Sequence, residues 1–354
     1  MKSWIFVISL SLVGQLAFTS PFHPCHVPDF YGKAVEQIKL GLKIPSQPRP
    51  STQTGIEEPV TQIDAPWGLA RISHADLLNR GTVGKYVYDP SGGLNVNVYI
   101  LATGIHLEHS DFGNRAIWGT TVATDSKSDD DNKGYGTHYA GTVAGKEFGV
   151  SKQATLIAVK TSESVLLNVA AMIEGVKWTI KDHQKRAADD GKLKGSVIML
   201  NTGMAPFSAR LIAALDTAYD AGIHVAVAAG DNDRDACQSA AGSTKGLVVG
   251  SSDARDDRSS WSDSGSCVDI FAPGDDILSA LPGKPDNSGI LGGTGSAAAH
   301  VAGLMAYFIS AADKGDSSPD VIKKKILDMA VKDMIHDVPD DAANVSRPLI
   351  SNVI

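Results

Sequence analysis

Apolar residues follow two alternating patterns through most of this chain, from about residue 96 to residue 330. Short runs rich in β-branched residues predict buried strands at 96–105, 154–161, 195–203, 224–230, 246–252 and 267–274. Helical periodicity or an excess of small residues predicts helices over 136–149, 168–188, 207–221 and 319–329. Strands that alternate with helices are typical of a mostly parallel central sheet covered by helices on both faces. The sequence therefore predicts a three-layer α/β fold.

The segment 291–310 has the most unusual composition in the chain. Its first half holds almost only Gly, Ala, Ser and Thr, and its second half carries Val301, Leu304, Met305 and Phe308 at helical spacing. Small residues allow close backbone approach, so we expect a buried helix entered through a glycine-rich turn. A closely packed core helix is one interpretation, and a site that needs open space beside the helix is the other.

Charge and motif content exclude several classes of function. The chain has 354 residues and a formal net charge of −8, which argues against a nucleic-acid or anionic-membrane partner. The sequence contains no phosphate-binding loop, dinucleotide glycine motif or Cys/His zinc spacing, so we expect no cofactor. The acidic loop 125–134 is typical of a solvated loop, with a cation site as the alternative. We expect a soluble monomer.

The N-terminal part of the chain differs in amino-acid composition from the rest. Residues 1–19 carry Lys2 and then an apolar run, which predicts a signal peptide, with an N-terminal anchor as the alternative. Residues 20–64, rich in Pro, Ser and Thr, predict a short pro-segment or linker. The folded domain is expected over 65–331 and a C-terminal tail over 332–354. A secreted or vacuolar protein follows from the signal peptide, and disulfides are then permitted.

Several long motifs occur in a characteristic order along the predicted domain. They are APWGLARISH at 65–74, YILATGI at 99–105, GTHYAGTVAG at 136–145, SDSGSCVDIFAPGDDILSA at 262–280 and GTGSAAAHVAG at 293–303. On these motifs the chain resembles the subtilisin family (peptidase S8) of serine proteases, of the fungal proteinase K and cerevisin type. The resemblance covers about residues 66–331 and implies a subtilisin-like fold.

Peptide hydrolysis in that family needs a serine nucleophile, a histidine base, an aspartate that orients the histidine and an asparagine in the oxyanion hole. The resemblance matches the aspartate to Ala102, the histidine to Tyr135, the serine to Gly295 and the asparagine to Asp231. Alanine and glycine supply no acid, base or nucleophile. Tyrosine, whose pKa is ordinarily near ~10, is a poor base at neutral pH. An aspartate would repel a developing oxyanion.

Two functions therefore stay open. The first is a catalytically inactive homologue that binds proteins or peptides, as a decoy or regulator. The second is a serine endopeptidase with a rebuilt triad, for which Ser296, His138, His106 and Asp111 are the available groups. Consecutive helical residues differ by about 100°, so Ser296 should point away from the Gly295 direction. The resemblance implies a structural role for His138.

The expected substrate groove also departs from the family pattern. In the family, an extended peptide pairs with two backbone segments, of which the first matches Asn201, Thr202, Gly203 and Met204. Methionine there replaces a glycine, and the second segment, near 163–166, has lost its glycines. We expect a reshaped or partly filled pocket, either through drift or as a new binding groove.

The resemblance implies three further features. Cys237 and Cys267 match paired cysteines of some relatives, which predicts a disulfide, with Cys25 left over. Relatives bind calcium near the strand that carries Asp269, so this residue is a candidate ligand. The sequon at Asn344 predicts N-glycosylation in an exposed tail.

Overall fold

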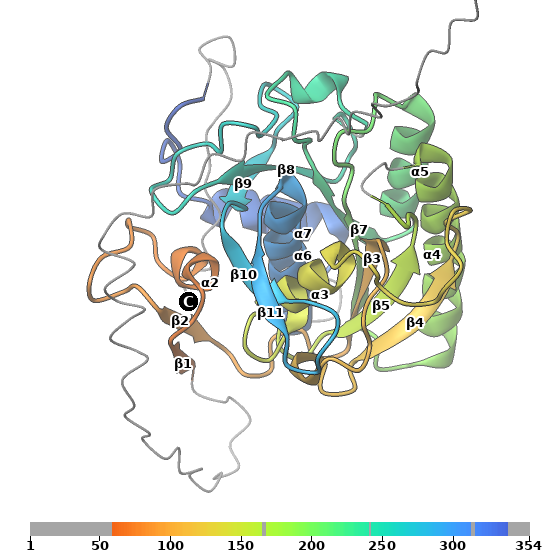
Figure 1. Cartoon of the computed structure of the whole chain (residues 1–354), viewed down its shortest axis with the longest axis horizontal. Coiled ribbons are helices and arrows are strands. Elements are labelled where there is room, and N and C mark those ends of the chain that lie inside the picture. Colours follow the sequence, from red (N-terminus) through yellow and green to blue (C-terminus); the bar gives the residue numbers. More distant parts are fainter. Residues whose placement is uncertain (1–58, 165–167, 241, 313–315, 339–354) are drawn as a thin grey trace, which may run out of the picture. The chain divides into compact units, whose positions relative to one another are not determined.

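The computed structural model describes residues 59–164, 168–240, 242–312 and 316–338, and its centre is a parallel β-sheet (Figure 1). The sheet has seven strands in the order β4-β5-β3-β6-β7-β8-β9, each paired in parallel with its neighbours. The strands are β3 Val96–Ala102, β4 Ala116–Thr121, β5 Thr155–Lys160, β6 Gly195–Leu200, β7 Ile223–Ala228, β8 Leu247–Ser252 and β9 Ile270–Pro273. The predicted parallel α/β architecture is confirmed.

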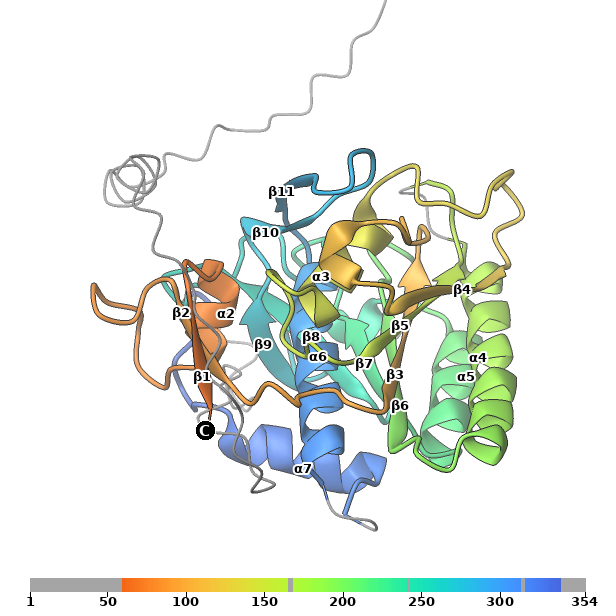
Figure 2. The ribbon, with the colours of Figure 1, turned by 90° about the horizontal axis from the view of Figure 1, so that it is seen from below.

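Helices cover both faces of this sheet (Figure 2). Helices α3 (Tyr135–Ala144) and α6 (Thr294–Ala311) pack on one face, and α4 (Val169–Asp189) and α5 (Ala209–Asp220) pack on the other. Alternate residues of β3 show the division, because Val98 and Ile100 join the core of α3 and α6, whereas Tyr99 and Leu101 join the core of α4 and α5. Covering on both faces explains why every residue of β3 is buried, including the polar Asn97.

Three of the helices begin at polar residues that cap their first turns. Asn168 accepts hydrogen bonds from the first backbone N–H groups of α4, and Ser208 caps α5 in the same way. Ser318 caps α7 (Pro319–Met329), which has a proline at its start and packs against α6. Side-chain oxygens at these positions satisfy N–H groups that have no partner within the helix. The local sequence thus determines where these helices start.

Helix α6 is the predicted buried helix. Every residue from Thr294 to Ile309 is buried, including the small residues of its first half. Gly303 shows why small size is needed, because a Cβ added there would lie 2.7 Å from the Cβ of Val150. The helix follows Gly293, which has φ 143° and a conformation that L side chains rarely adopt.

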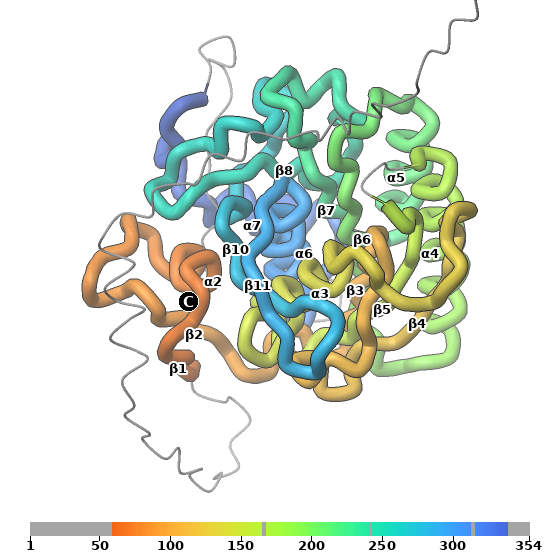
Figure 3. The backbone as a smooth tube through the Cα atoms, viewed as in Figure 1, coloured from red at the N-terminus to blue at the C-terminus, as the bar shows by residue number. Residues whose placement is uncertain are grey.

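Two antiparallel pairs of strands and several short elements complete the fold. Strands β10 (Ile277–Ala280) and β11 (Ser288–Leu291) pair beside α3, as the tube in Figure 3 shows. Ser279 donates a hydrogen bond to the carbonyl of His138, although the two are 141 residues apart in sequence. The other elements are β1 Val60–Ile63, α2 Trp67–Ile72, β2 Lys85–Tyr88 and the 3₁₀ turns Ser110–Phe112 and Ala236–Gln238.

The folded region extends beyond the predicted boundaries at both ends. Strand β1 lies within the predicted linker and pairs with β2 in an antiparallel sheet. At the other end, Ile335 and Val338 are buried, and His336 forms a β-bridge with Asp257. Neither segment was predicted from composition, because each is short and its β-pairing partners lie elsewhere in the sequence. The predicted signal peptide lies outside the described residues.

Candidate functional site

The matched positions converge at the carboxyl edge of the sheet. Ala102 is the last residue of β3, while Asn201 and Asp231 lie in the turns that follow β6 and β7. Tyr135 begins α3, and Gly295 lies in the first turn of α6. Ligands of parallel α/β sheets bind at the carboxyl ends of the strands. The sequence therefore placed the candidate site on the edge where this fold forms sites.

The turn after β3 is locked to the start of α3. A Cβ on Gly136 would lie 1.9 Å from the carbonyl oxygen of Gly104, so only glycine allows this approach. Thr103 Oγ1 accepts from the Gly136 N–H at 3.0 Å and donates to Asp131 Oδ1 at 2.8 Å. Asp131 also accepts from the N–H and the hydroxyl of Thr137, at 2.8 and 2.7 Å. These contacts hold the residues that follow Ala102 against the residues that follow Tyr135.

The space beside Gly295 is filled by a second tyrosine. A Cβ on Gly295 would lie 2.6 Å from Tyr139 Oη and 3.0 Å from Asn201 Oδ1, both below normal contact distance. Tyr139 is only 2% exposed, and its ring centroid lies 6.4 Å from that of Tyr135. Burial, with Asp231 and Tyr135 nearby, raises the pKa of Tyr139 well above its ordinary value. The phenol is therefore neutral and forms part of the core.

Sequence reasoning missed Tyr139. We expected Met204 to reshape or fill the groove, but Met204 is 61% exposed at the surface. The side chain that fills the space beside Gly295 comes from α3. The signal was present in the sequence, because Tyr139 follows Tyr135 by four residues and such residues share one helical face.

Asp231 contacts the start of α6. Its Oδ1 accepts from both the N–H and the hydroxyl of Thr294 at 2.8 Å, and the Gly230 N–H donates to the same hydroxyl at 3.1 Å. Helix α6 has no capping side chain of its own, since Gly293 is its N-cap. A carboxylate near a helix N-terminus interacts favourably with the helix dipole. Burial nevertheless raises the pKa of Asp231 above its ordinary value.

The groups available for a rebuilt triad do not assemble. Ser296 is fully buried, and within the described residues its Oγ has no hydrogen-bond partner. His138 is also buried, and its Nε2 lies 2.8 Å from the carbonyl oxygen of Ile277. Burial lowers the pKa of His138 to about 4. A buried hydroxyl cannot reach a peptide carbonyl, so Ser296 lacks the access that a nucleophile needs.

His106 and Asp111 lie apart from each other. The imidazole of His106 lies 3.3 Å from Asp130 Oδ1, beside the start of α3. Asp111 lies at the opposite end of α3, where its Oδ1 accepts from the Glu147 N–H at 2.6 Å. Burial raises the pKa of Asp111. In the part of the chain that the structure describes, no serine hydroxyl or cysteine thiol hydrogen-bonds to the His106 imidazole.

The remaining groove residues form the turn after β6, in which only Met204 is exposed. Thr202 is buried and donates to the carbonyl of Ala228 at 2.8 Å, and the Gly203 N–H donates to Asn201 Oδ1 at 3.1 Å. Asn201 is therefore turned back onto its own backbone. In the second groove segment, Glu163 forms an ion pair with Lys160 at 2.6 Å. Residues 165–167 lie outside the described residues.

The predicted disulfide is confirmed. Cys237 and Cys267 are bonded, with their Cα atoms 5.1 Å apart, and the bridge ties the loop after β7 to the segment before β9. Asn344 and Cys25 lie outside the described residues, so glycosylation and the state of the third cysteine remain predictions. No helix in the described part of the chain is long and apolar enough to cross a bilayer.

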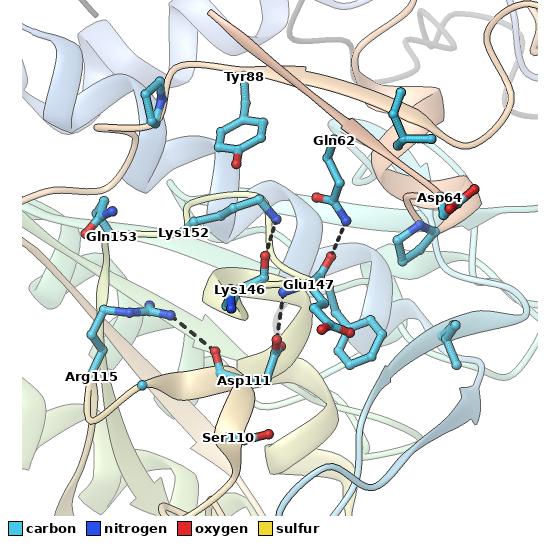
Figure 4. A pocket seen from close by; sticks show the side chains of 16 residues that line it. Gln62, Asp64, Tyr88, Ser110, Asp111, Arg115, Lys146, Glu147, Lys152 and Gln153 are labelled. Carbon is cyan, nitrogen blue, oxygen red and sulfur yellow. Dashed lines mark hydrogen bonds between the residues drawn. The ribbon is translucent and has the colours of Figure 1, made fainter. Parts of the chain in front are cut away.

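A cavity of about 680 Å³, which Asp111 helps to line, lies between the antiparallel β1–β2 pair and the C-terminal end of α3 (Figure 4). Lys152 Nζ donates to the carbonyls of Lys146 and Gly149 at 2.9 and 3.0 Å, and it lies over the rings of Tyr86 and Tyr88. Burial lowers the pKa of Lys152 to about 8. The cation is satisfied within the protein, so we assign the cavity no ligand.

The candidate calcium ligand is paired with a lysine. Asp269 Oδ1 lies 3.3 Å from Lys323 Nζ, and Asp269 Oδ2 accepts from the Val248 N–H at 2.8 Å. Calcium takes 6–8 oxygen ligands in proteins. Within the described residues, no group of three His, Cys, Asp or Glu side chains is arranged to hold a metal ion. An ammonium on the carboxylate means that these residues do not fit calcium.

The sheet order, the helices on both faces and the glycine-rich start of α6 define a subtilisin-like α/β protein. The solved structure of a cold-adapted subtilisin-like serine proteinase superposes with a TM-score of 0.70 at 29% identity, covering 82% of this chain and 99% of that one. The family model for the subtilase family (Peptidase_S8) matches residues 93–347. The chain belongs to the subtilase family.

Fungal proteases are among the most similar relatives. Alkaline protease 2 of Aspergillus fumigatus is 40% identical over 330 residues, which is 89% of this chain and 66% of the relative. Cerevisin of Saccharomyces cerevisiae is 43% identical over 298 residues, which is 80% of this chain and 47% of the relative. The chain thus spans about half to two thirds of the length of these relatives.

Proposed function

We propose that this chain is a catalytically inactive member of the subtilase family that acts by binding proteins or peptides, as a decoy or regulator, in the secretory pathway. The contact between Gly295 and Tyr139 carries the proposal. Gly295 provides no nucleophile, and the volume that a side chain there would need is occupied by a buried phenol ring. Position 295 thus lacks both a nucleophile and the space for one.

The other matched positions support the same function. Ala102 has no carboxylate to orient a base, and the phenol hydroxyl of Tyr135 is a poor substitute for an imidazole as proton acceptor. Asp231 directs its carboxylate at the N-terminus of α6, where an oxyanion would otherwise be stabilised. In a subtilisin, disabling the triad costs about 10⁶ in turnover. Each replacement removes a different requirement of the same reaction.

The signal-peptide pattern and the disulfide support a location in the secretory pathway, with the extracellular space and the vacuole as the two destinations. The fold supports binding because subtilases recognise extended peptides by backbone pairing along the turn after β6. Exposed Met204 and Phe207 lie on that turn, 61% and 51% exposed. They offer apolar surface to a protein or peptide partner.

A fluorophosphonate probe tests the loss of nucleophilic activity. The purified protein should remain unlabelled and should not cleave peptide substrates, whereas an active fungal subtilase treated in parallel is labelled. The Ser296→Ala variant is the matched control for the rebuilt triad. Labelling that disappears in Ser296→Ala would show that a serine endopeptidase has been rebuilt from that hydroxyl, and it would overturn the proposal.

A further inference from the structure

Three oxygen atoms from two other parts of the chain lie around the ammonium group of Lys323. Lys323 extends from α7, and its Nζ donates to the backbone carbonyls of Lys245 and Gly246 at 3.1 and 2.8 Å. The third oxygen is Asp269 Oδ1, at 3.3 Å. An ammonium has three N–H donors and no acceptor, so three oxygens match its full donor capacity.

The same donor types are those that a hard metal cation prefers. Carboxylate and backbone carbonyl oxygens are the usual protein ligands of calcium. Here they come from the loop before β8 and from the residue that precedes β9. Lys323 is 24% exposed and Asp269 is 27% exposed, so both groups are largely withdrawn from solvent. A positive charge is needed there because a partly buried carboxylate would otherwise be uncompensated.

The surroundings of this cluster are acidic, which strengthens the need for a cation. Asp216 accepts from the Lys245 N–H at 2.7 Å and from the Thr244 hydroxyl at 2.9 Å. Asp220 pairs with Lys245 Nζ at 2.7 Å. The side chain of Tyr219 donates to Asp320 Oδ1 at 2.8 Å, and burial together with Asp320 and Asp269 raises the pKa of Tyr219. The loop that offers the two carbonyls is thus fixed by α5.

We propose that the Lys323 ammonium is a built-in cation that takes the place of a bound calcium ion between α7 and the edge of β8 and β9. A tethered charge has no binding equilibrium, so the folded state does not depend on free calcium. It also attaches α7 to the sheet. Removal of the ammonium leaves two carbonyls and a carboxylate directed at the same point, which is a latent calcium site.

Thermal unfolding of wild type and Lys323→Met, each with a chelator and with millimolar calcium, tests this inference. The melting temperature of wild type should be the same in both conditions. Lys323→Met should melt a few degrees lower (about 2–4 °C per kcal/mol lost) and should recover with added calcium. The double variant Lys323→Met/Asp269→Asn should melt low and should not respond to calcium. Lys324→Ala is the matched control, since Lys324 on the same helix is 74% exposed.

Two results would overturn the inference. A calcium-dependent rise in the melting temperature of wild type that disappears in Asp269→Asn would show that the protein binds the metal despite Lys323. If Lys323→Met is destabilised and its melting temperature does not rise with calcium, the contact between Lys323 and Asp269 is an ordinary ion pair. If Lys323→Met does not fold, wild type and Asp269→Asn are titrated with calcium in a calorimeter. Heat of binding in wild type that is absent in Asp269→Asn would contradict the proposal.

Discussion

The phenolic oxygen of Tyr139 lies 2.6 Å from the place that a Cβ on Gly295 would occupy. Real Cβ atoms essentially never approach another atom so closely. The position of Tyr139 is therefore compatible with glycine at 295 and not with a larger residue. Tyr139 cannot simply move away, because it extends from α3 and is buried where α3 packs against α6. Restoring a serine therefore requires two changes and not one.

Gly295→Ser should lower the free energy of unfolding by about 1–3 kcal/mol, the usual cost of overpacking a core. Tyr139→Val alone is also destabilising, because it opens a cavity. In the Tyr139→Val background, Gly295→Ser should cost at least about 1 kcal/mol less than in wild type. Urea unfolding of the four proteins of this cycle measures the coupling. Gly191→Ser is the control, since nothing lies within 4 Å of a Cβ at exposed Gly191.

The contact between Tyr139 and Gly295 also determines how activity would be regained. We expect no peptidase activity when Ala102→Asp, Tyr135→His, Gly295→Ser and Asp231→Asn are combined. Adding Tyr139→Val to this set should make the serine reactive towards a fluorophosphonate. Reactivity in the set that retains Tyr139 would contradict the role assigned to the phenol ring.

Asp231→Ala should lower the free energy of unfolding by about 1 kcal/mol, because the N–H of Thr294 and the N-terminus of α6 lose their acceptor. Asp231→Asn should cost less, since an amide oxygen still accepts the hydrogen bond without the charge. Urea unfolding compares the two with Asp286→Ala, a substitution at an exposed position in the β10–β11 loop. Equal stability of Asp231→Ala and wild type would show that the contact with α6 contributes nothing.

Reduction of the Cys237–Cys267 bond should lower the free energy of unfolding by about 3–4 kcal/mol in the chain-entropy model, given a sequence separation of 30 residues. The measurement is thermal unfolding with and without a reductant. The Cys237→Ala/Cys267→Ala variant should melt at the temperature of the reduced protein and should not respond to the reductant. A reductant effect that persists in this variant would have to come from another source.

Stability should fall as the pH drops from about 6.5 towards 4. Burial lowers the pKa of His138, His224 and His300 each to about 4, whereas unfolded histidine titrates near ~6.5. The unfolded chain then binds more protons, and each histidine contributes a slope of up to ~1.4 kcal/mol per pH unit. The raised pKa values of Asp111 and Asp231 act in the opposite direction, because those carboxyls keep protons in the folded state above pH ~3.8.

His224→Gln isolates one histidine from this sum. Between pH 5 and 6.5, the free energy of unfolding of the variant should depend less steeply on pH than that of wild type. The difference in slope is up to ~1.4 kcal/mol per pH unit, which corresponds to one proton. Denaturant titrations at several pH values measure the difference, and the opposing carboxyls cancel in the comparison. If the unfolding free energies of His224→Gln and wild type show the same pH dependence, buried His224 does not contribute to the loss of stability at low pH.

The sequence by itself determined the layers of the fold. The central strand β3 and the capped starts of α4, α5 and α7 follow from local patterns. Strand β4 was missed because it is an edge strand that contains Gly119 and a register shift between Trp118 and Thr120. Strand β1 was missed because it has only four residues and its backbone pairs with β2, which follows helix α2 in the sequence.

The chemistry of the candidate site divides in the same way. Residue types alone exclude a standard triad at Ala102, Tyr135 and Gly295, and the order of motifs alone located those positions. Only the tertiary structure shows that Tyr139 fills the space at Gly295, that Asp231 contacts α6 and that Lys323 pairs with Asp269. The physical reason is that each of these is a contact between elements distant in sequence. Periodicity reports which face a residue is on, whereas packing decides which atoms it meets.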